Sequence, residues 1–296
     1  MGKIRMCFQR NINGARKRMN LISSPLRYPG GKSCLTKHFS DLIKLNRLNN
    51  ITYVEPFAGG AGAALNLLFL EYVNSIWIND ADYNIYSFWS SILNQTDDFI
   101  KLISSTSINL KNWHYYKTIV QNNKMYDVLE VGFATFFLNR CNHSGIINAR
   151  PIGGLKQSGN WKIDARFNKA NLIKRIERIS YYKDRIILSN KDAYSLLPEF
   201  NNSDYLIYFD PPYFNKGKEL YLNYYRPKDH VRLAEYINNK LISKWILSYD
   251  NVQSILDLYQ DNKHIFFNIN YSANKPKQGN EVIFYSNNLQ IPSFTR

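Results

Sequence analysis

An acid, two prolines and an aromatic side chain stand together where a buried strand is expected to end. Asp210, Pro211, Pro212 and Tyr213 follow the apolar run 204–209, and the prolines lack the N–H groups that a continuing strand needs. The Asp210 carboxylate and the free carbonyls beside it can accept both hydrogens of an exocyclic NH2 group. Such bonds favour a pyramidal nitrogen, which can attack an activated methyl group directly while Tyr213 stacks on its ring. The pattern predicts methylation of a ring amine; the alternative is a proline-rich strand exit without chemistry.

A glycine-rich turn lies upstream, between the β-rich run 51–55 and the apolar run 63–72. Its residues are Glu55, Pro56, Phe57, Ala58, Gly59 and Gly60, and Asp80 follows at the end of the next expected strand, 75–79. Ligands of open parallel sheets bind beyond the carboxyl ends of the strands, where an acid can accept hydrogen bonds from both ribose hydroxyls. Glu55 would repel a pyrophosphate. The turn therefore favours S-adenosylmethionine, which carries an ammonium and a sulfonium group and no phosphate, over a dinucleotide.

The segment 29–33 (PGGKS) invites comparison with a phosphate-binding loop. That motif needs a glycine five residues before the second glycine of the segment and a strand leading into it. Position 26 is Leu26, which Pro25 and Pro29 flank, and no strand is expected before the segment. A turn before the helix expected from Ser33 to Lys44 is the simpler interpretation, and a ligand role for Tyr28 and Lys32 is the third.

The elements that must position these residues alternate in the order of a parallel α/β sheet. Strands are expected at 51–55, 75–79, 185–189, 204–209, 245–248, 265–269 and 281–285, with helices between them at 63–72, 83–93, 193–197, 231–239 and 252–259. The stretch 95–184 is different: it has helical patches at 114–121 and 125–139 and then a strand-poor, Gly/Asn/Arg-rich stretch, 142–168. We expect three parts: a basic arm over 1–24, a cofactor-binding domain over 25–94 and 185–296, and an insertion over 95–184.

Charge is unevenly distributed along the 296 residues, which contain 38 Lys and Arg against 23 Asp and Glu. Residues 1–50 carry eleven basic side chains and one acid, and residues 140–191 carry twelve against three. Clustered basic charge indicates a polyanionic partner such as nucleic acid, although a merely basic surface remains the alternative.

Several protein classes are disfavoured. The three cysteines are too few and too scattered for a disulfide framework or a zinc site, so we expect a reducing, cytoplasmic compartment and no metal. No apolar signal core follows the basic N-terminus. The longest apolar-rich stretch, 61–70, is too short to span a membrane, so no membrane partner is expected.

The order of these motifs resembles that of the Dam-like, alpha-group DNA adenine-N6 methyltransferases. The matching segments are 26–32 (LRYPGGK), 54–62 (VEPFAGGAG), 78–86 (INDADYNIY), 139–145 (NRCNHSG) and 208–213 (YFDPPY). The resemblance implies a Rossmann-like, S-adenosylmethionine-dependent methyltransferase sheet with a mainly helical target-recognition insertion. It also implies that Tyr28 and Lys32 contact the cofactor, that Glu55, Phe57 and Gly59 line its pocket, and that Asp80 holds the ribose.

By the same resemblance, Asp192 and Ala193 lie where the cofactor's adenine binds, and Asp210 serves both cofactor and target amine. Two stretches depart from the family pattern. The arm 1–24 has no counterpart, and 140–168 differs from the usual target-recognition hairpin, so the DNA sequence that is recognised does not follow.

A methyltransferase that acts on a base in a duplex must flip that base out of the stack. Arginine, asparagine and serine suit base edges, and lysine suits phosphates. The candidate DNA-binding residues are Arg140, Asn142, His143, Ser144, Arg150, Lys156 and Lys162. Each could equally be a phosphate contact or a plain surface residue.

The expected function is thus methyl transfer to adenine N6 in double-stranded DNA, in a restriction-modification, phage or orphan context. A cognate restriction endonuclease is a further expected partner, and the chain is expected to be a monomer or weak dimer. Methylation of cytosine N4 or of RNA adenine, and a non-catalytic basic DNA-binding protein on the same fold, are the alternatives.

Overall fold

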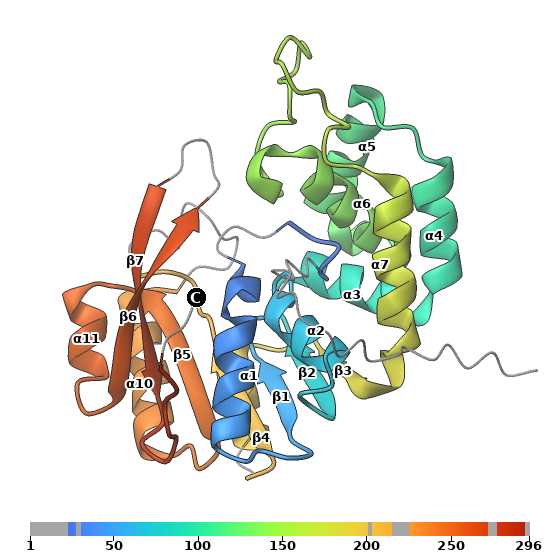
Figure 1. Ribbon diagram of the computed structural model, residues 1–296. Coiled ribbons are helices and arrows are strands. Elements are labelled where there is room, and N and C mark those ends of the chain that lie inside the picture. Colours follow the sequence, from blue (N-terminus) through green and yellow to red (C-terminus); the bar gives the residue numbers. More distant parts are fainter. Residues whose placement is uncertain (1–22, 28–30, 201–202, 215–224, 272–276, 294–296) are drawn as a thin grey trace, which may run out of the picture.

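The computed structural model describes residues 23–27, 31–200, 203–214, 225–271 and 277–293. Seven described strands form one sheet in the order β3-β2-β1-β4-β5-β7-β6 (Figure 1). The neighbours among β1 to β5 pair in parallel, and β7 is antiparallel to both β5 and β6. The bounds are β1 Thr52–Glu55, β2 Ser75–Asn79, β3 Ile186–Ser189, β4 Tyr205–Phe209, β5 Lys244–Asp250, β6 Lys263–Tyr271 and β7 Lys277–Tyr285.

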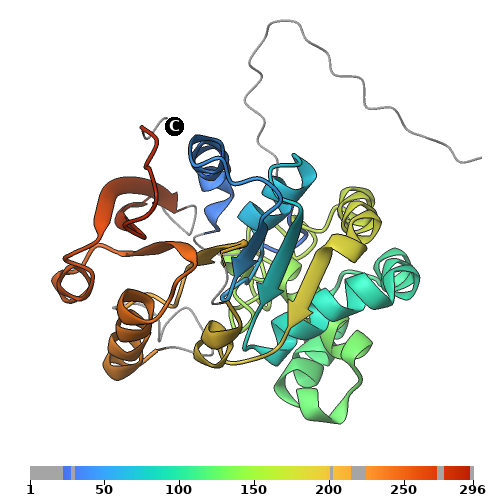
Figure 2. The ribbon, with the colours of Figure 1, turned by 90° about the horizontal axis from the view of Figure 1, so that it is seen from below.

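The central strands are buried on both faces, which explains their nearly continuous apolar sequences. Along β4, Leu206 and Tyr208 pack into one hydrophobic cluster, while Ile207 and Phe209 pack into the other. Helices α1 (Thr36–Leu45) and α2 (Gly62–Phe69) belong to the first cluster. Helices α8 (Ala193–Leu196), α10 (Pro227–Asn239) and α11 (Gln253–Leu258) belong to the second. Figure 2 shows α1 and α10 on opposite sides of the sheet.

Between β2 and β3 the chain leaves the sheet and builds a helical layer. Helix α3 (Tyr83–Asn94) comes first, followed by α4 (Thr96–Ser105), α5 (Leu110–Gln121), α6 (Val128–Cys141) and α7 (Lys169–Tyr181). Phe88 of α3 stacks on Phe136 of α6 at a centroid distance of 5.8 Å. Short 3-10 turns occur at η1 Lys32–Leu35, η2 Asn123–Met125, η3 His143–Gly145, η4 Lys183–Arg185 and η5 Leu197–Phe200. In Figure 1 this layer rises above the edge of the sheet where β1 to β4 end.

The α/β class and the strands expected from the sequence are confirmed, with differences in length. Strands β6 and β7 are longer than expected, and helices α4 and α7 were not expected at all. Helix α7 carries an apolar face of Leu172, Ile176 and Ile179, and Asn168 caps its N-terminus. None of the helices in the described part of the chain is long and apolar enough to cross a membrane.

Candidate active site

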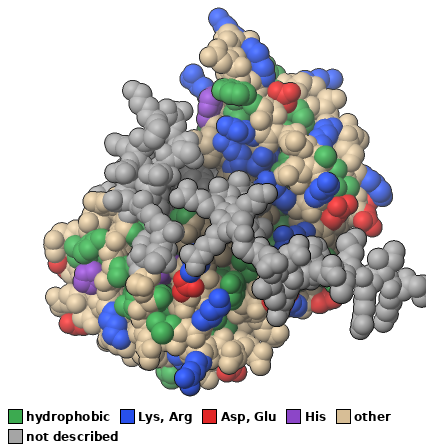
Figure 3. Space-filling model, viewed as in Figure 1, with side chains coloured by type: hydrophobic (Ala, Val, Ile, Leu, Met, Phe, Trp, Pro, Cys, Tyr) green, Lys and Arg blue, Asp and Glu red, His purple; other side chains and the backbone are tan. Residues whose placement is uncertain are grey.

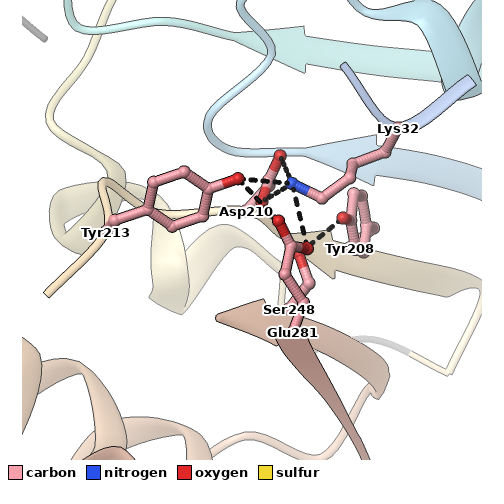
Figure 4. A network of polar contacts seen from close by, with 6 residues as sticks. All are labelled: Lys32, Tyr208, Asp210, Tyr213, Ser248 and Glu281. Carbon is pink, nitrogen blue, oxygen red and sulfur yellow. Dashed lines mark hydrogen bonds and ion pairs between the residues drawn. The ribbon is translucent and has the colours of Figure 1, made fainter. Parts of the chain in front are cut away.

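The carboxylate of Asp210 lies just beyond the end of β4 and is held by two side chains from distant elements. Lys32 Nζ lies 2.8 Å from Asp210 Oδ1 and 3.0 Å from Oδ2 (Figure 4). Ser248 of β5 donates its hydroxyl hydrogen to Asp210 Oδ1 at 2.8 Å. Because an ammonium and a hydroxyl group both donate to it, the carboxylate is fixed in one orientation.

Tyr213 is fixed at its hydroxyl group. It donates to Glu281 Oε1 at 2.7 Å, and Lys32 Nζ lies 3.5 Å from the same hydroxyl oxygen and 3.6 Å from Glu281 Oε2. Glu281 is fully buried, at 0% exposure, and Tyr213 is 5% exposed. A single buried ammonium group therefore faces two carboxylates and the tyrosine between them.

Ser248 is in turn held by a further hydrogen bond within the sheet. Tyr208 of β4 and Ser248 of β5 share a hydrogen bond of 2.7 Å between their hydroxyl groups, and both residues are buried. Burial raises the pKa of the Tyr208 hydroxyl group, and the Asp210 charge raises it further. Tyr208 is thus a neutral hydrogen-bonding group, which leaves Ser248 to donate to Asp210.

Sequence reasoning missed Ser248 and Glu281 as site residues. Each is a polar residue next to apolar ones in an expected strand, Ser248 at the end of 245–248 and Glu281 at the start of 281–285. Burial of a lone acid costs free energy unless the acid is paired. An acid in a strand expected to be buried was therefore the feature of the sequence that could have identified Glu281. Its partner could not be named, because Lys32 and Tyr213 lie far away in the sequence.

The glycine-rich turn after β1 folds against the end of β2. The Gly59 N–H group donates to Asp80 Oδ2 at 2.9 Å, and Trp89 Nε1 donates to the Gly59 carbonyl at 2.9 Å. Gly59 has a φ of 46°, a left-handed conformation that glycine adopts without strain. Asn79 Nδ2 donates to the carbonyls of Pro56 and Lys191, each at 2.9 Å, and so connects the turn to the end of β3. Ala58 and Gly60 of the same turn are buried.

The Asp80 carboxylate is half-buried at this junction. Its Oδ1 accepts from the Asp82 N–H group at 2.9 Å, and burial, followed by the Asp82 charge, raises its pKa to about 7. Each oxygen retains a second lone pair, because it accepts one hydrogen bond within the protein. Hydroxyl donors placed here would stabilise the charged form, as the ribose interpretation of Asp80 requires.

Glu55 ends β1 as a buried carboxylate. Its Oε1 accepts from the Ala64 N–H group at the start of α2 at 3.1 Å. Its pKa is raised to about 8, mainly by burial and also by the Asp210 charge, while the Lys32 charge opposes the increase. Glu55 therefore lies within electrostatic reach of the Lys32–Asp210 pair, as expected for two strand ends that are neighbours in the sheet.

The two remaining predicted cofactor contacts lie at the end of β3. Asp192 caps α8 by accepting from the Tyr194 and Ser195 N–H groups, and Ala193 is buried beside it. Burial, followed by the Asp192 charge, raises the pKa of the Tyr225 hydroxyl group. The Tyr225 ring lies 5.6 Å from the Phe57 ring in an edge contact. Tyr225 thus lies beside Phe57 and within electrostatic reach of Asp192, and it was not predicted. Tyr28 lies outside the described residues.

These groups fit S-adenosylmethionine better than a phosphate-bearing cofactor. Two carboxylates, Glu55 and Asp80, lie beside the glycine-rich turn, and the ammonium of Lys32 is engaged with Asp210. Such acidic groups suit an ammonium group and ribose hydroxyls, which favour their charged form, and they offer no positive charge to a phosphate. Among the described residues, no group of three or more His, Cys, Asp or Glu side chains is arranged to hold a metal ion.

The predicted DNA-binding residues separate into two groups. Asn142 is fully buried, at 0% exposure; its amide accepts from Trp113 Nε1 and donates to the Ile146 and Ile147 carbonyls. We therefore correct its role: Asn142 shapes the loop after α6 and has no free edge for a base. Arg140 is half-buried and donates to the Arg166 and Pro25 carbonyls.

The other candidates remain accessible. His143, Arg150 and Lys156 are exposed, and Ser144 is half-buried with a φ of 55°. Lys162 is exposed, but its Nζ donates to the Gln157 and Gly159 carbonyls and so holds the loop together. Beside it lies Trp161, which is 71% exposed and which the sequence did not single out. An exposed aromatic ring among basic side chains is a stacking surface for a base.

Fold and site together define a Rossmann-like methyltransferase, because the functional groups gather where the strand order reverses between β1 and β4. Comparison with known proteins narrows this class. The profile of the D12 class N6 adenine-specific DNA methyltransferases matches residues 28–275, and the chain belongs to that family. The resemblance noted in the sequence is confirmed: the protein is an adenine-specific DNA methyltransferase, with DNA as substrate and a methyl donor as cofactor.

Two relatives align over most of their length. The type II methyltransferase M.CviBI of Paramecium bursaria Chlorella virus NC1A is 23% identical over 83% of this chain and 90% of its own. The type II methyltransferase M.MjaIII of Methanocaldococcus jannaschii is 26% identical over 79% of this chain and 87% of its own. A solved methyltransferase structure from Pyrococcus horikoshii aligns with a TM-score of 0.41 at 9% identity over 88% of this chain and 84% of that one, too weak a likeness for argument.

Proposed function

We propose that the protein transfers the methyl group of S-adenosylmethionine to N6 of an adenine flipped out of duplex DNA, and that Asp210 is its principal catalytic residue. The observation that carries the proposal is the contact between Lys32 Nζ and Asp210 at 2.8 Å. The contact shows that the Asp210 carboxylate accepts hydrogen bonds from a nitrogen at the position where the target amine is expected. The family assignment favours adenine over cytosine N4 and over a non-catalytic binding protein.

Asp210 acts as acceptor for the N6 hydrogens. Ser248 and Lys32 hold its carboxylate in one orientation, so the carboxylate itself need not turn when the amine arrives. The hydrogen bond to the amine strengthens as the nitrogen becomes pyramidal, which lowers the barrier for the chemical step more than it improves substrate binding. The bound cofactor would supply an electrophilic methyl group on its sulfonium.

Pro211, Pro212 and Tyr213 shape the pocket for the flipped ring. The prolines end β4 and are themselves buried. Tyr213 offers its ring for stacking, and its bond to Glu281 fixes the ring's position. Because Tyr213 is only 5% exposed, a base reaches it only after neighbouring side chains give way.

The cofactor pocket is assigned to the edge where β1, β2 and β3 end. Asp80 would hold the ribose hydroxyls and Glu55 the ammonium group, while Phe57, Gly59 and Gly60 allow close approach at the turn. Asp192 and Ala193 are assigned to the adenine end, with Tyr225 as an added neighbour. Lys32 joins this pocket to the catalytic acid.

The insertion 95–184 is proposed to recognise the target, and 25–94 with 185–296 to carry the chemistry. His143, Ser144, Arg150, Lys156 and Lys162 are assigned to DNA contact, with Trp161 as a stacking ring. Both curated relatives are named as type II methyltransferases. That supports a role beside a restriction endonuclease in a restriction-modification system.

The test is transfer of labelled methyl groups from S-adenosylmethionine to duplex DNA, followed by nucleoside analysis and methylation-sensitive sequencing. N6-methyladenine in one sequence context is the expected product. Label in cytosine, or in RNA but not in duplex DNA, would overturn the proposal.

A further inference from the structure

Four arginines from separate parts of the chain meet beside the segment that leads to Lys32. They are Arg27, Arg140 at the end of α6, Arg166 in the following loop, and Arg175 of α7; we call them the arginine quartet. Arg166 is exposed, and the other three are half-buried. All four residues are therefore at least partly exposed to solvent.

Backbone carbonyls hold the quartet in place. Arg140 Nε donates to the Arg166 carbonyl at 2.8 Å. Arg27 Nη1 donates to the Asn142 carbonyl at 3.0 Å, and Arg175 Nη1 donates to the Ser24 carbonyl at 2.8 Å. A guanidinium group has five N–H donors, so Arg27 and Arg175 retain donors for a ligand.

Asn139 of α6 holds the backbone of Arg27 in position. It accepts from the Arg27 N–H group at 2.7 Å and donates to the Arg27 and Gly145 carbonyls, each at 2.8 Å. A Cβ on Gly145 would lie 2.2 Å from the Arg27 carbonyl oxygen, so only glycine fits there. The cluster is therefore built on a rigid joint between segment 23–27 and the insertion.

The quartet forms no ion pair within the described residues, although the charge of Asp164 acts on Cys141 together with those of Arg140 and Arg27. Burial, then the charges of Arg27 and Arg175, lower the pKa of Arg140, so the repulsion between them is appreciable. Residues 1–22 contain six Lys and Arg and no Asp or Glu, so their side chains supply no carboxylate either. Repelling cations that are held together in this way indicate a missing anion.

We propose that the arginine quartet is a binding site for the phosphodiester backbone of duplex DNA. The inference rests on the proposed function and adds to it a site made of residues other than the loop residues 143–162, which it adjoins at Gly145. Figure 3 shows Lys and Arg side chains gathered on this face, over the helical layer. Arginine binds phosphate through paired N–H groups, and a phosphate here would neutralise charge that enters no ion pair within the described residues.

The site has a second consequence. Segment 23–27, which the quartet and Asn139 hold, leads within a few residues to Lys32 on Asp210. DNA bound at the quartet would therefore dock against the same joint that positions the catalytic segment.

The experiment measures duplex DNA affinity at several salt concentrations for wild type, Arg166→Gln, Arg166→Lys and Lys174→Gln. Arg166 has no side-chain hydrogen bond to another described residue, so its loss tests charge and not packing. Lys174 is an exposed neighbour of Arg175 on α7 and serves as the matched control. Thermal unfolding and S-adenosylmethionine binding are measured on each variant.

Arg166→Gln is expected to reduce the slope of log affinity against log salt by about one phosphate contact, or about 0.9. Arg166→Lys and Lys174→Gln should keep the wild-type slope. Cofactor affinity should not change, and the melting temperature of Arg166→Gln should equal or exceed that of wild type, because a repulsive charge is gone.

A wild-type salt slope in Arg166→Gln would overturn the quartet proposal. So would a lower melting temperature with weaker cofactor binding, since that marks a structural role. Methylation of duplex DNA by wild type in the same preparation separates the two proposals: if it is absent, the proposed function fails, whatever the slopes are.

Discussion

Lys32 Nζ lies 2.8 Å from Asp210 Oδ1, although the two residues are 178 positions apart in the chain. The ammonium group occupies the donor position that the target amine needs, so the amine must share the carboxylate with Lys32 or displace it. Glu281 Oε2, 3.6 Å from the same nitrogen, is a second acceptor close to Lys32. The site is therefore arranged for exchange of partners around one carboxylate.

The hydrogen bond between Tyr213 and Glu281 is predicted to contribute both to stability and to the rate of methyl transfer. Tyr213→Phe removes the hydroxyl group that donates to Glu281 Oε1. Because Glu281 is buried, loss of this hydrogen bond should lower the unfolding free energy by about 1–3 kcal/mol. Single-turnover methyl transfer should slow as well, because the ring loses its fixed position. Denaturant unfolding and rapid-quench kinetics measure the two effects.

Tyr115→Phe is the control for that substitution, since Tyr115 is exposed on α5. The double variant Tyr213→Phe/Glu281→Gln should be less destabilised than the sum of the single variants. Strict additivity would show that the two side chains do not depend on each other and would remove the positioning role.

Glu55 predicts a stability change with pH. Its pKa is about 8 in the folded protein against an ordinary value of 4.5, so the folded state keeps a proton that the unfolded chain has lost between these values. The unfolding free energy therefore falls as pH rises through this window, by at most about 1.4 kcal/mol per pH unit, and levels off above it. Glu55→Gln removes this dependence.

Melting temperatures of wild type and Glu55→Gln, measured without cofactor from pH 5 to pH 8, provide the test. The melting temperature of Glu55→Gln, relative to that of wild type, should increase as pH rises. Glu235→Gln, an exposed change on α10, should show no such trend. Parallel curves for Glu55→Gln and wild type would contradict the assigned pKa. The same substitution should weaken S-adenosylmethionine binding, because the ammonium group loses its carboxylate.

Asp80 is expected to contribute to cofactor affinity. Asp80→Asn cannot accept from two hydroxyl groups as a carboxylate does, and binding should weaken by roughly 1–3 kcal/mol. Calorimetry with S-adenosylmethionine in EDTA measures this, with Asp97→Asn on the exposed side of α4 as control. Unchanged affinity in Asp80→Asn would refute the ribose assignment, and loss of wild-type binding in EDTA would refute metal-free binding.

The sequence was most informative where a feature is local. Apolar runs such as 204–209 predicted strands, and the acids that follow them fell at one edge because the carboxyl ends of parallel strands meet there. Helix α7 was not predicted, although Leu172, Ile176 and Ile179 repeat at helical spacing, because four Lys and Arg side chains are interspersed with these apolar positions.

The roles that depend on distant partners could not be predicted. Asn142 has the residue type of a base-reading side chain, but Trp113 Nε1 and two loop carbonyls satisfy its amide inside the protein. Arg140 likewise holds backbone carbonyls. Ser248 and Glu281 became site residues only when β5 and β7 came together beside β4.

The most direct test of the account is single-turnover methyl transfer to duplex DNA by Asp210→Ala. Removal of one acceptor that acts mainly in the transition state should lower the rate at least about 10²-fold. Duplex affinity should change little, and circular dichroism should show a folded protein. Asp204→Ala, an exposed change just before the same strand, should transfer methyl groups at the wild-type rate. A folded Asp210→Ala protein that methylates DNA as fast as wild type would contradict the proposed mechanism.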